Sequence, residues 1–176
     1  MLMNNTFRLV LIGIFVAQSL VLYIIEGLLP VPFIAPGAKL GLANLITVIA
    51  LYTLPKKKDV ALILFLRILL STAFAGGINA FFYSVCGAIF SFGGMALLQK
   101  THRFSLFGVS AAGGIFHNIG QLLVAACIVE NLHLFLYTPV LTLTGTGTGI
   151  LIGIIAAFTL QHLKKLPLFK RLKTFS

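Results

Sequence analysis

The stretch PKKKD, residues 55–59, stands between two apolar segments and indicates how the whole chain folds. A proline followed by three lysines does not continue an apolar helix, so this stretch marks a loop at a membrane surface. The same alternation extends along the chain, of which 59% is hydrophobic and only 9% is charged. Because a soluble domain carries about 25% charged residues, the composition predicts an integral membrane protein.

Six apolar segments are expected to cross the bilayer, for which a helix needs roughly 17–25 residues. The first segment is too long for the apolar part of a signal peptide and has no A-x-A cleavage site, so we expect it to remain as a helix. We predict an all-α fold: a polytopic six-transmembrane-helix bundle in one integral membrane domain, residues 1–176, with a basic tail at 161–176. The expected helices cover residues 7–28, 38–54, 60–74, 79–98, 106–128 and 140–160.

Lysine and arginine occupy alternate loops, and this pattern predicts the orientation of the bundle. The loops at 29–37, 75–78 and 129–139 contain neither residue, whereas Arg8, PKKKD, the loop after the fourth helix and the tail are basic. Because basic residues collect on the cytoplasmic side, both termini are expected in the cytoplasm. A net charge of +10 could also suggest nucleic-acid binding, but charges set in short runs between apolar segments argue against it.

Two basic residues, Lys39 and Arg67, do not follow the loop pattern. A charge at membrane depth is costly and usually faces a cavity or a partner. The only acid within reach is Glu26, near the outer end of the first helix, and it could pair with either base. One acid cannot neutralise two bases, so an anionic ligand could supply the missing charge. Alternatively, the second base extends to the membrane surface or bonds backbone carbonyls.

Further polar residues lie in the expected helices and add to the candidate substrate-binding set. In GGIFHNIGQ, residues 113–121, the spacing places Gly114, His117, Asn118 and Gln121 on one helical face. Such a stripe could form interhelical hydrogen bonds or line a cavity. Most of the polar groups fall in the outer half or middle of the bundle, which suggests a pocket reached from outside. The candidate set is Glu26, Lys39, Asn44, Arg67, Asn79, Tyr83, His117, Asn118 and Gln121.

No pattern in the sequence indicates catalysis. The three acids, Glu26, Asp59 and Glu130, are too scattered for a Mg²⁺ site, and no Cys/His cluster suggests zinc. GTGTGILIG, residues 145–153, lacks the lysine of a P-loop and favours a close-packed helix face. We therefore expect no catalytic residues, no metal and no cofactor, and a protein that is not an enzyme. Gly13 and Ala17 form a similar small-residue step, which could pack within the bundle or dock a partner.

Three stretches together resemble the bacterial Gx transporter family, often labelled heptaprenyl diphosphate synthase component I. They are PGAKLGLANLITVIALY (36–52), RILLSTAFAGG (67–77) and GGIFHNIGQLLVA (113–125). The family is similar in size and helix count to the S components of energy-coupling factor (ECF) vitamin transporters. The resemblance therefore implies a protein of the bacterial cytoplasmic membrane.

The likeness to S components implies capture of a small molecule from outside, such as a vitamin, a flavin or a quinone precursor. The loop at 29–37 would act as a lid, and Gly13 and Ala17 would help to dock a coupling subunit that carries two ATPases. The family label implies an alternative, a non-catalytic membrane component associated with heptaprenyl diphosphate or menaquinone biosynthesis.

Overall fold

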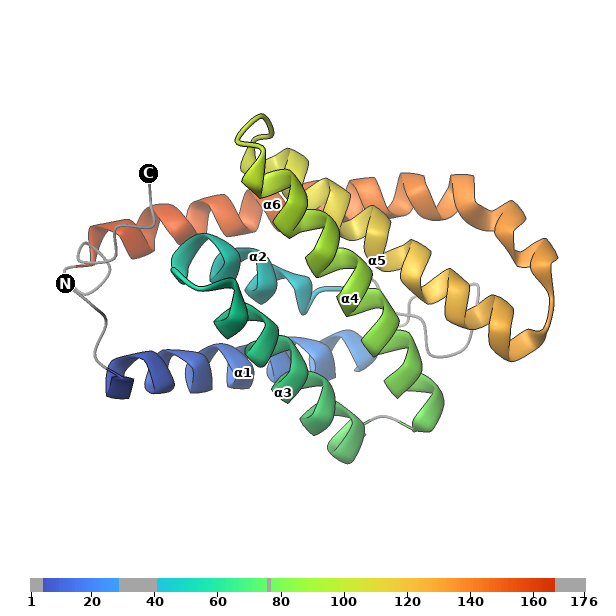
Figure 1. Cartoon of the computed structure of the whole chain (residues 1–176), viewed down its shortest axis with the longest axis horizontal. Coiled ribbons are helices and arrows are strands. Elements are labelled where there is room, and N and C mark those ends of the chain that lie inside the picture. The colour runs from blue at the N-terminus through green and yellow to red at the C-terminus, as the bar shows by residue number, and fades with distance from the viewer. Residues whose placement is uncertain (1–4, 29–40, 76, 167–176) are drawn as a thin grey trace.

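The computed structural model describes residues 5–28, 41–75 and 77–166, and all of the regular structure in these ranges is helical. Figure 1 shows the helices gathered into one bundle, in which α5 packs against both α4 and α6. The predicted all-α fold is confirmed. The elements are α1 (Asn5–Leu28), α2 (Asn44–Thr53), α3 (Lys57–Ala75), α4 (Ile78–Lys100), α5 (Leu106–Val129), the 3-10 helix η1 (Leu132–Tyr137) and α6 (Thr138–Lys165).

The second helix differs most from its predicted bounds of 38–54. Residues 38–40 lie outside the described ranges, and α2 begins only at Asn44. Gly41 has a φ of 87°, a left-handed conformation that does not occur within an α-helix and that glycine adopts at little cost. The backbone N–H groups of Asn44 and Leu45 donate to the carbonyls of Gly41 (2.8 Å) and Leu42 (3.0 Å), which forms a turn leading into the helix.

The start of α3 and the loop before α6 also differ from the sequence prediction. The third helix begins at Lys57 rather than at residue 60, so two lysines of the PKKKD stretch belong to α3. The predicted loop at 129–139 is not wholly irregular, because η1 occupies Leu132–Tyr137 and leads directly into α6. Asn131 begins η1 by accepting a hydrogen bond from the His133 N–H through its side chain (2.9 Å).

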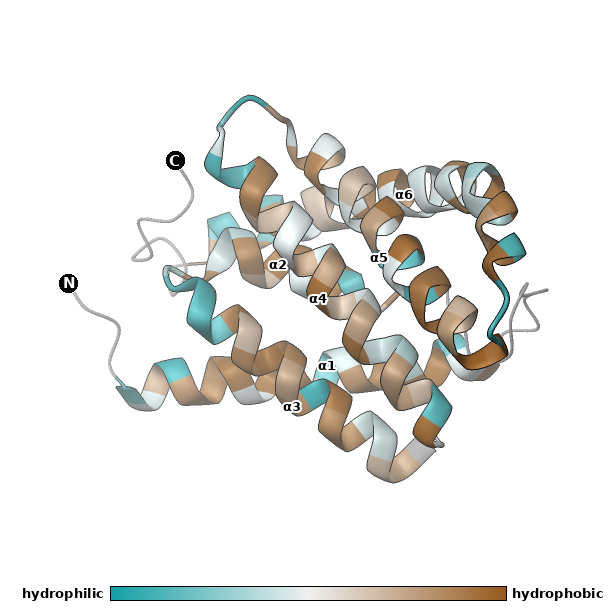
Figure 2. Ribbon diagram, turned by 45° about the vertical axis from the view of Figure 1, so that its right-hand side comes forward, coloured by the Kyte–Doolittle hydropathy of each residue, from teal (hydrophilic) through white to brown (hydrophobic). Residues whose placement is uncertain are grey.

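Four helical segments of the described residues are long and apolar enough to cross a membrane: α1, α4, α5, and η1 together with α6. Helix α2 has 10 residues and is about 15 Å long, half of the hydrocarbon thickness of about 30 Å. Helix α3 has 19 residues but carries four charged ones, Lys57, Lys58, Asp59 and Arg67. The count of six spans therefore stays a prediction. Figure 2 shows hydrophilic residues gathered at the α2–α3 link and the α4–α5 turn.

The α5–α6 contact depends on glycines, as the GTGTGILIG stretch predicted. A Cβ atom added at Gly114 of α5 would lie 2.1 Å from the carbonyl oxygen of Gly145 of α6. A Cβ atom at Gly149 would lie 2.6 Å from the Cα atom of Ala111. The two backbones approach so closely that only glycine fits at these positions, which confirms a close-packed helix face.

Polar contacts join the basic ends of several helices on one side of the bundle. Arg8, near the start of α1, donates from Nε (2.7 Å) and from Nη2 to the two carboxylate oxygens of Asp59, near the start of α3. Lys57 Nζ donates to the Ala96 carbonyl of α4 (2.7 Å), and Gln99 Nε2 to the Leu51 carbonyl of α2 (3.0 Å). These bonds hold α1, α2, α3 and α4 together where the predicted cytoplasmic loops lie.

Candidate functional site

Five of the predicted binding residues are buried inside the bundle and form a connected group, which we call the polar core. Each of the five is less than a tenth exposed, with Glu26 at 2% and Arg67 at 3%. The polar core comes from four helices, so it exists only in the folded bundle. Its members are Glu26 of α1, Asn44 of α2, Arg67 of α3, and His117 and Gln121 of α5.

Glu26 joins α1 to the turn before α2. Its carboxylate accepts hydrogen bonds from two successive backbone N–H groups, Gly41 at 2.5 Å and Leu42 at 3.0 Å. These N–H groups lie just before the N-terminus of α2, where the helix dipole favours negative charge. One turn and two turns earlier on α1, Tyr23 and Ser19 are also buried. Glu26 therefore fixes the position of the Gly41 turn against α1.

Arg67 brings a positive charge into the same group. The guanidinium interacts electrostatically with the Glu26 carboxylate and with Tyr23. The sequence left a pairing of Glu26 with Lys39 or with Arg67 open, and this electrostatic interaction concerns Arg67 alone, because Lys39 lies outside the described residues. Arg67 Nε is buried and has no hydrogen-bond partner among the residues that the structure describes.

His117 and Gln121 complete the polar core from α5. The Gln121 amide N–H donates to His117 Nε2 (3.0 Å), so this ring nitrogen acts as the acceptor. The imidazole ring lies against two glycines: an added Cβ atom would lie 2.7 Å from the ring at Gly87 of α4 and 3.1 Å from it at Gly41. The absence of side chains at both positions makes room for the ring.

Asn44 lies beside the Gly41 turn, and neither polar atom of its amide has a hydrogen-bond partner within the described part of the chain. A buried polar atom without a partner costs about 1–3 kcal/mol, and such atoms are rare in native proteins. Among the described residues no three His, Cys, Asp or Glu side chains gather as metal ligands. The chemistry that the polar core offers is therefore hydrogen bonding and charge.

The stripe in GGIFHNIGQ does not form one face, and this part of the sequence analysis was wrong. Asn118 donates from Nδ2 to the Leu141 carbonyl (2.9 Å), so it lies toward α6 together with Gly114. Asn118 is turned about 100° from His117 around the helix axis, which is enough to reach a different neighbour. Asn118 lies outside the polar core.

Two other candidates also lie apart from the polar core. Asn79 is exposed near the start of α4. Tyr83 is buried, but it packs with Val124 and Ala125 in an apolar cluster farther along α5. The sequence analysis did not identify Gly87, whose place among apolar residues of α4 gave no sign that His117 packs against it.

Gly13 and Ala17 lie on an exposed side of α1. A Cβ atom added at Gly13 would have no described atom within 4 Å. The interpretation that this small-residue step packs within the bundle is therefore wrong, and its role in docking a partner stays a prediction.

The helices and the polar core define an all-helical membrane protein with a buried polar group that is open to further hydrogen bonding. The model of the family heptaprenyl diphosphate synthase component I matches residues 15–159, and the chain belongs to this family. The resemblance to this family is confirmed, and every residue of the polar core lies within the matched range. Searches among curated proteins and solved structures found no match. The family name and the apolar helices together indicate a membrane-associated role.

Proposed function

We propose that this chain is a membrane subunit that binds a small anionic or amphipathic molecule in its polar core and serves the uptake of that molecule. In this role it acts like the S component of an ECF transporter, with a separate coupling subunit and ATPases supplying the energy. Candidate substrates are vitamin-like molecules, flavins and quinone precursors such as aromatic acids. The chain itself performs no catalysis in this proposal.

One observation carries the proposal: Arg67 Nε and both polar atoms of the Asn44 amide are buried without partners in the described ranges. Intramembrane charges are conspicuous because they are costly, and they commonly mark substrate pathways. A ligand that accepts a hydrogen bond from Arg67 and exchanges hydrogen bonds with Asn44 offsets the cost of burying these groups. An anion suits Arg67 best, since the Glu26 carboxylate is also engaged by two backbone N–H groups.

The proposal extends to the placement of the chain in the bacterial cytoplasmic membrane. We place the basic helix ends, joined by Arg8, Asp59, Lys57 and Gln99, on the cytoplasmic side, with both termini there and six spans in one domain. Lys39 adds a second positive charge on the outer side. The exposed side of α1 with Gly13 and Ala17 is the proposed docking surface for the coupling subunit.

A second candidate function is favoured by the family name. The chain would then be a non-catalytic membrane component associated with heptaprenyl diphosphate or menaquinone biosynthesis. Affinity purification separates the two functions, because an S component copurifies with a coupling subunit and ATPases, whereas a biosynthetic component copurifies with a prenyl synthase.

The binding proposal is tested on the full chain in lipid nanodiscs. Native mass spectrometry identifies any copurified small molecule, and riboflavin and 1,4-dihydroxy-2-naphthoate are then titrated. We expect at least one of these ligands to bind. Arg67→Gln should weaken its binding by about 30-fold or more, since losing one partner of a buried charged contact costs about 2–5 kcal/mol.

Arg8→Gln is the matched control, because Arg8 has its own partner in Asp59 and lies outside the polar core. This variant should unfold at a lower temperature and keep the wild-type affinity. The proposal would be contradicted if no small molecule copurified with the chain and neither titrated compound bound to it. Equal affinity in the wild type and in Arg67→Gln would remove Arg67 from the site.

A further inference from the structure

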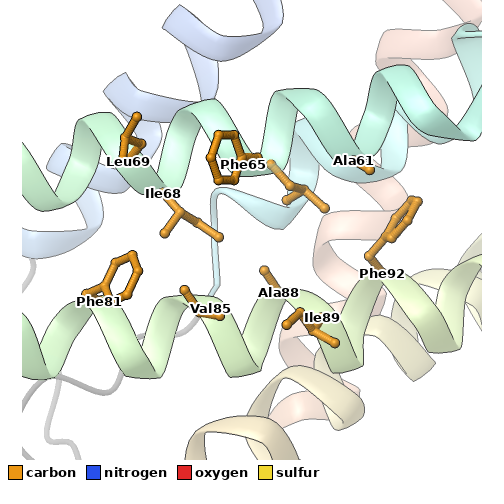
Figure 3. A pocket seen from close by; sticks show the side chains of 10 residues that line it. Ala61, Phe65, Ile68, Leu69, Phe81, Val85, Ala88, Ile89 and Phe92 are labelled. Carbon is orange, nitrogen blue, oxygen red and sulfur yellow. The ribbon is translucent and has the colours of Figure 1, made fainter.

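An apolar groove with a volume of about 340 Å³ lies between α3 and α4. Figure 3 shows that its labelled lining side chains come from these two helices and are built of carbon alone. The floor is made by buried Leu64, Ile68 and Ala88, which pack together as one cluster. The rim includes Phe65 and Ile89, which are 61% and 63% exposed. The groove therefore opens to the outside of the bundle, where a membrane places hydrocarbon.

The groove and the polar core lie on neighbouring faces of the same helices. Arg67 directly precedes Ile68 and is turned about 60° from Leu64 around the axis of α3. On α4, Gly87 contacts the His117 ring, and the next residue, Ala88, belongs to the floor of the groove. The floor of the groove therefore lies next to Arg67 along α3 and next to a contact of the His117 ring along α4.

A hydrocarbon chain in a bilayer gains little by moving from lipid into an apolar groove, because lipid tails are equally apolar. The groove by itself does not select a ligand. A ligand becomes specific when a charged head group fixes it, and Arg67, with its unpartnered Nε, is the cation nearest to the floor of the groove among the described residues of α3 and α4.

We propose that the groove holds the hydrocarbon chain of an amphipathic anion whose head group binds Arg67 in the polar core. This inference rests on the proposed function and narrows its substrate class to an anion that carries a hydrocarbon chain, in place of a compact polar molecule. An ordinary bilayer lipid or a partner helix in the groove is an outcome against it.

The test uses the full chain in nanodiscs and four probes. Farnesyl diphosphate and palmitate each join a hydrocarbon chain to an anion, whereas inorganic diphosphate lacks the chain and farnesol lacks the charge. We expect farnesyl diphosphate or palmitate to bind at least tenfold more tightly than diphosphate and farnesol. The tighter of the two identifies the head group as a phosphate or a carboxylate.

Ala61→Trp fills the groove from an exposed position on α3, and Ile89→Trp fills it from α4. Each variant, checked for folding by size-exclusion chromatography, should bind the chain-bearing anion at least tenfold more weakly. The matched control is Ala73→Trp, which is exposed on α3 but does not line the groove, and it should bind as the wild type does.

Four results would overturn the inference. Farnesol could bind as tightly as farnesyl diphosphate, which would show that the groove accepts lipid in general. The two groove-filling variants could bind the chain-bearing anion as the wild type does. Inorganic diphosphate or riboflavin could bind tightly, with an affinity that depends on Arg67, while the chain-bearing anions do not bind. The proposed function would then stand, and the groove would have no part in it. No binding of any probe or panel compound would overturn both.

Discussion

The two sides of α5 carry similar polar residues, but these residues differ in how fully they are hydrogen-bonded. Toward α6, Ser110 Oγ donates to the Gly149 carbonyl (2.6 Å) and Asn118 Nδ2 donates to the Leu141 carbonyl (2.9 Å). Toward α4 and the Gly41 turn, His117 and Gln121 bond to each other, while the nearby Asn44 amide and Arg67 Nε have unpartnered atoms within the described ranges. On the α6 side, polar side chains complete a helix contact. On the other side, they form a group that still has hydrogen bonds to offer.

The largest expected effect comes from a change on the α6 side. Gly114→Leu places a side chain where a Cβ atom alone would lie 2.1 Å from the Gly145 carbonyl oxygen. Neither backbone can move without separating the helices. We therefore expect the free energy of unfolding to fall by at least about 3 kcal/mol, the upper end of the range for overpacked cores. Fluorescence-detected size-exclusion chromatography of a tagged chain should show little monodisperse protein.

Gly147→Leu is the control for this change, since a Cβ atom at Gly147 of α6, the helix that packs against Gly114, meets no described atom within 4 Å. It should give a wild-type profile. A normal profile for Gly114→Leu would mean that α5 and α6 do not pack as closely as described.

A smaller effect is expected at the Gly41 turn of the polar core. Gly41→Ala forces a left-handed conformation on alanine, at about 1–2 kcal/mol, and its Cβ atom would lie 3.0 Å from Asn44 Nδ2 and 3.1 Å from the His117 ring. We expect a lower midpoint of thermal unfolding and a weaker affinity for the ligand identified by mass spectrometry. Both are measured on the same nanodisc sample.

Gly93→Ala serves as the counterpart on α4, where an added Cβ atom meets no described atom within 4 Å. Alanine is favoured over glycine inside a helix by about 0.5–1 kcal/mol, so this variant should be slightly more stable and should bind normally. A Gly41→Ala protein as stable as Gly93→Ala would show that the turn does not need glycine.

The sequence predicted the helical class and most helix ends because these depend on local properties, such as apolar segments broken by PKKKD and by glycine. A charge or an amide inside an apolar segment is conspicuous in a sequence, so residues such as Arg67 and Gln121 could be noticed before their burial was known. The start of α2 was predicted too early because the bonds from Gly41 and Leu42 to Glu26 are tertiary. The sequence analysis placed Asn118 and His117 on one face of α5. Helical spacing gives the direction of a side chain around the axis, but it does not say which neighbouring helix lies in that direction.

A small loss of stability is expected from Asn118→Ala, which removes the bond to the Leu141 carbonyl. Hydrogen bonds between membrane helices contribute about 0.6 kcal/mol on average, so the midpoint of thermal unfolding should fall slightly. Ligand affinity should stay at the wild-type value because Asn118 lies outside the polar core. A loss of affinity in this variant would extend the binding site toward α6.

The most direct test of the central claim compares Asn44→Ala with Asn118→Ala in one titration of the identified ligand. The Asn44 amide makes no hydrogen bond within the described ranges, and burying it without a partner is costly, so its removal should leave the free protein at least as stable as the wild type. Affinity should nevertheless fall by about tenfold, which corresponds to about 1.4 kcal/mol. The account predicts weaker binding in Asn44→Ala alone. Unchanged binding in Asn44→Ala, with a loss of stability instead, would contradict it and make the polar core a packing contact.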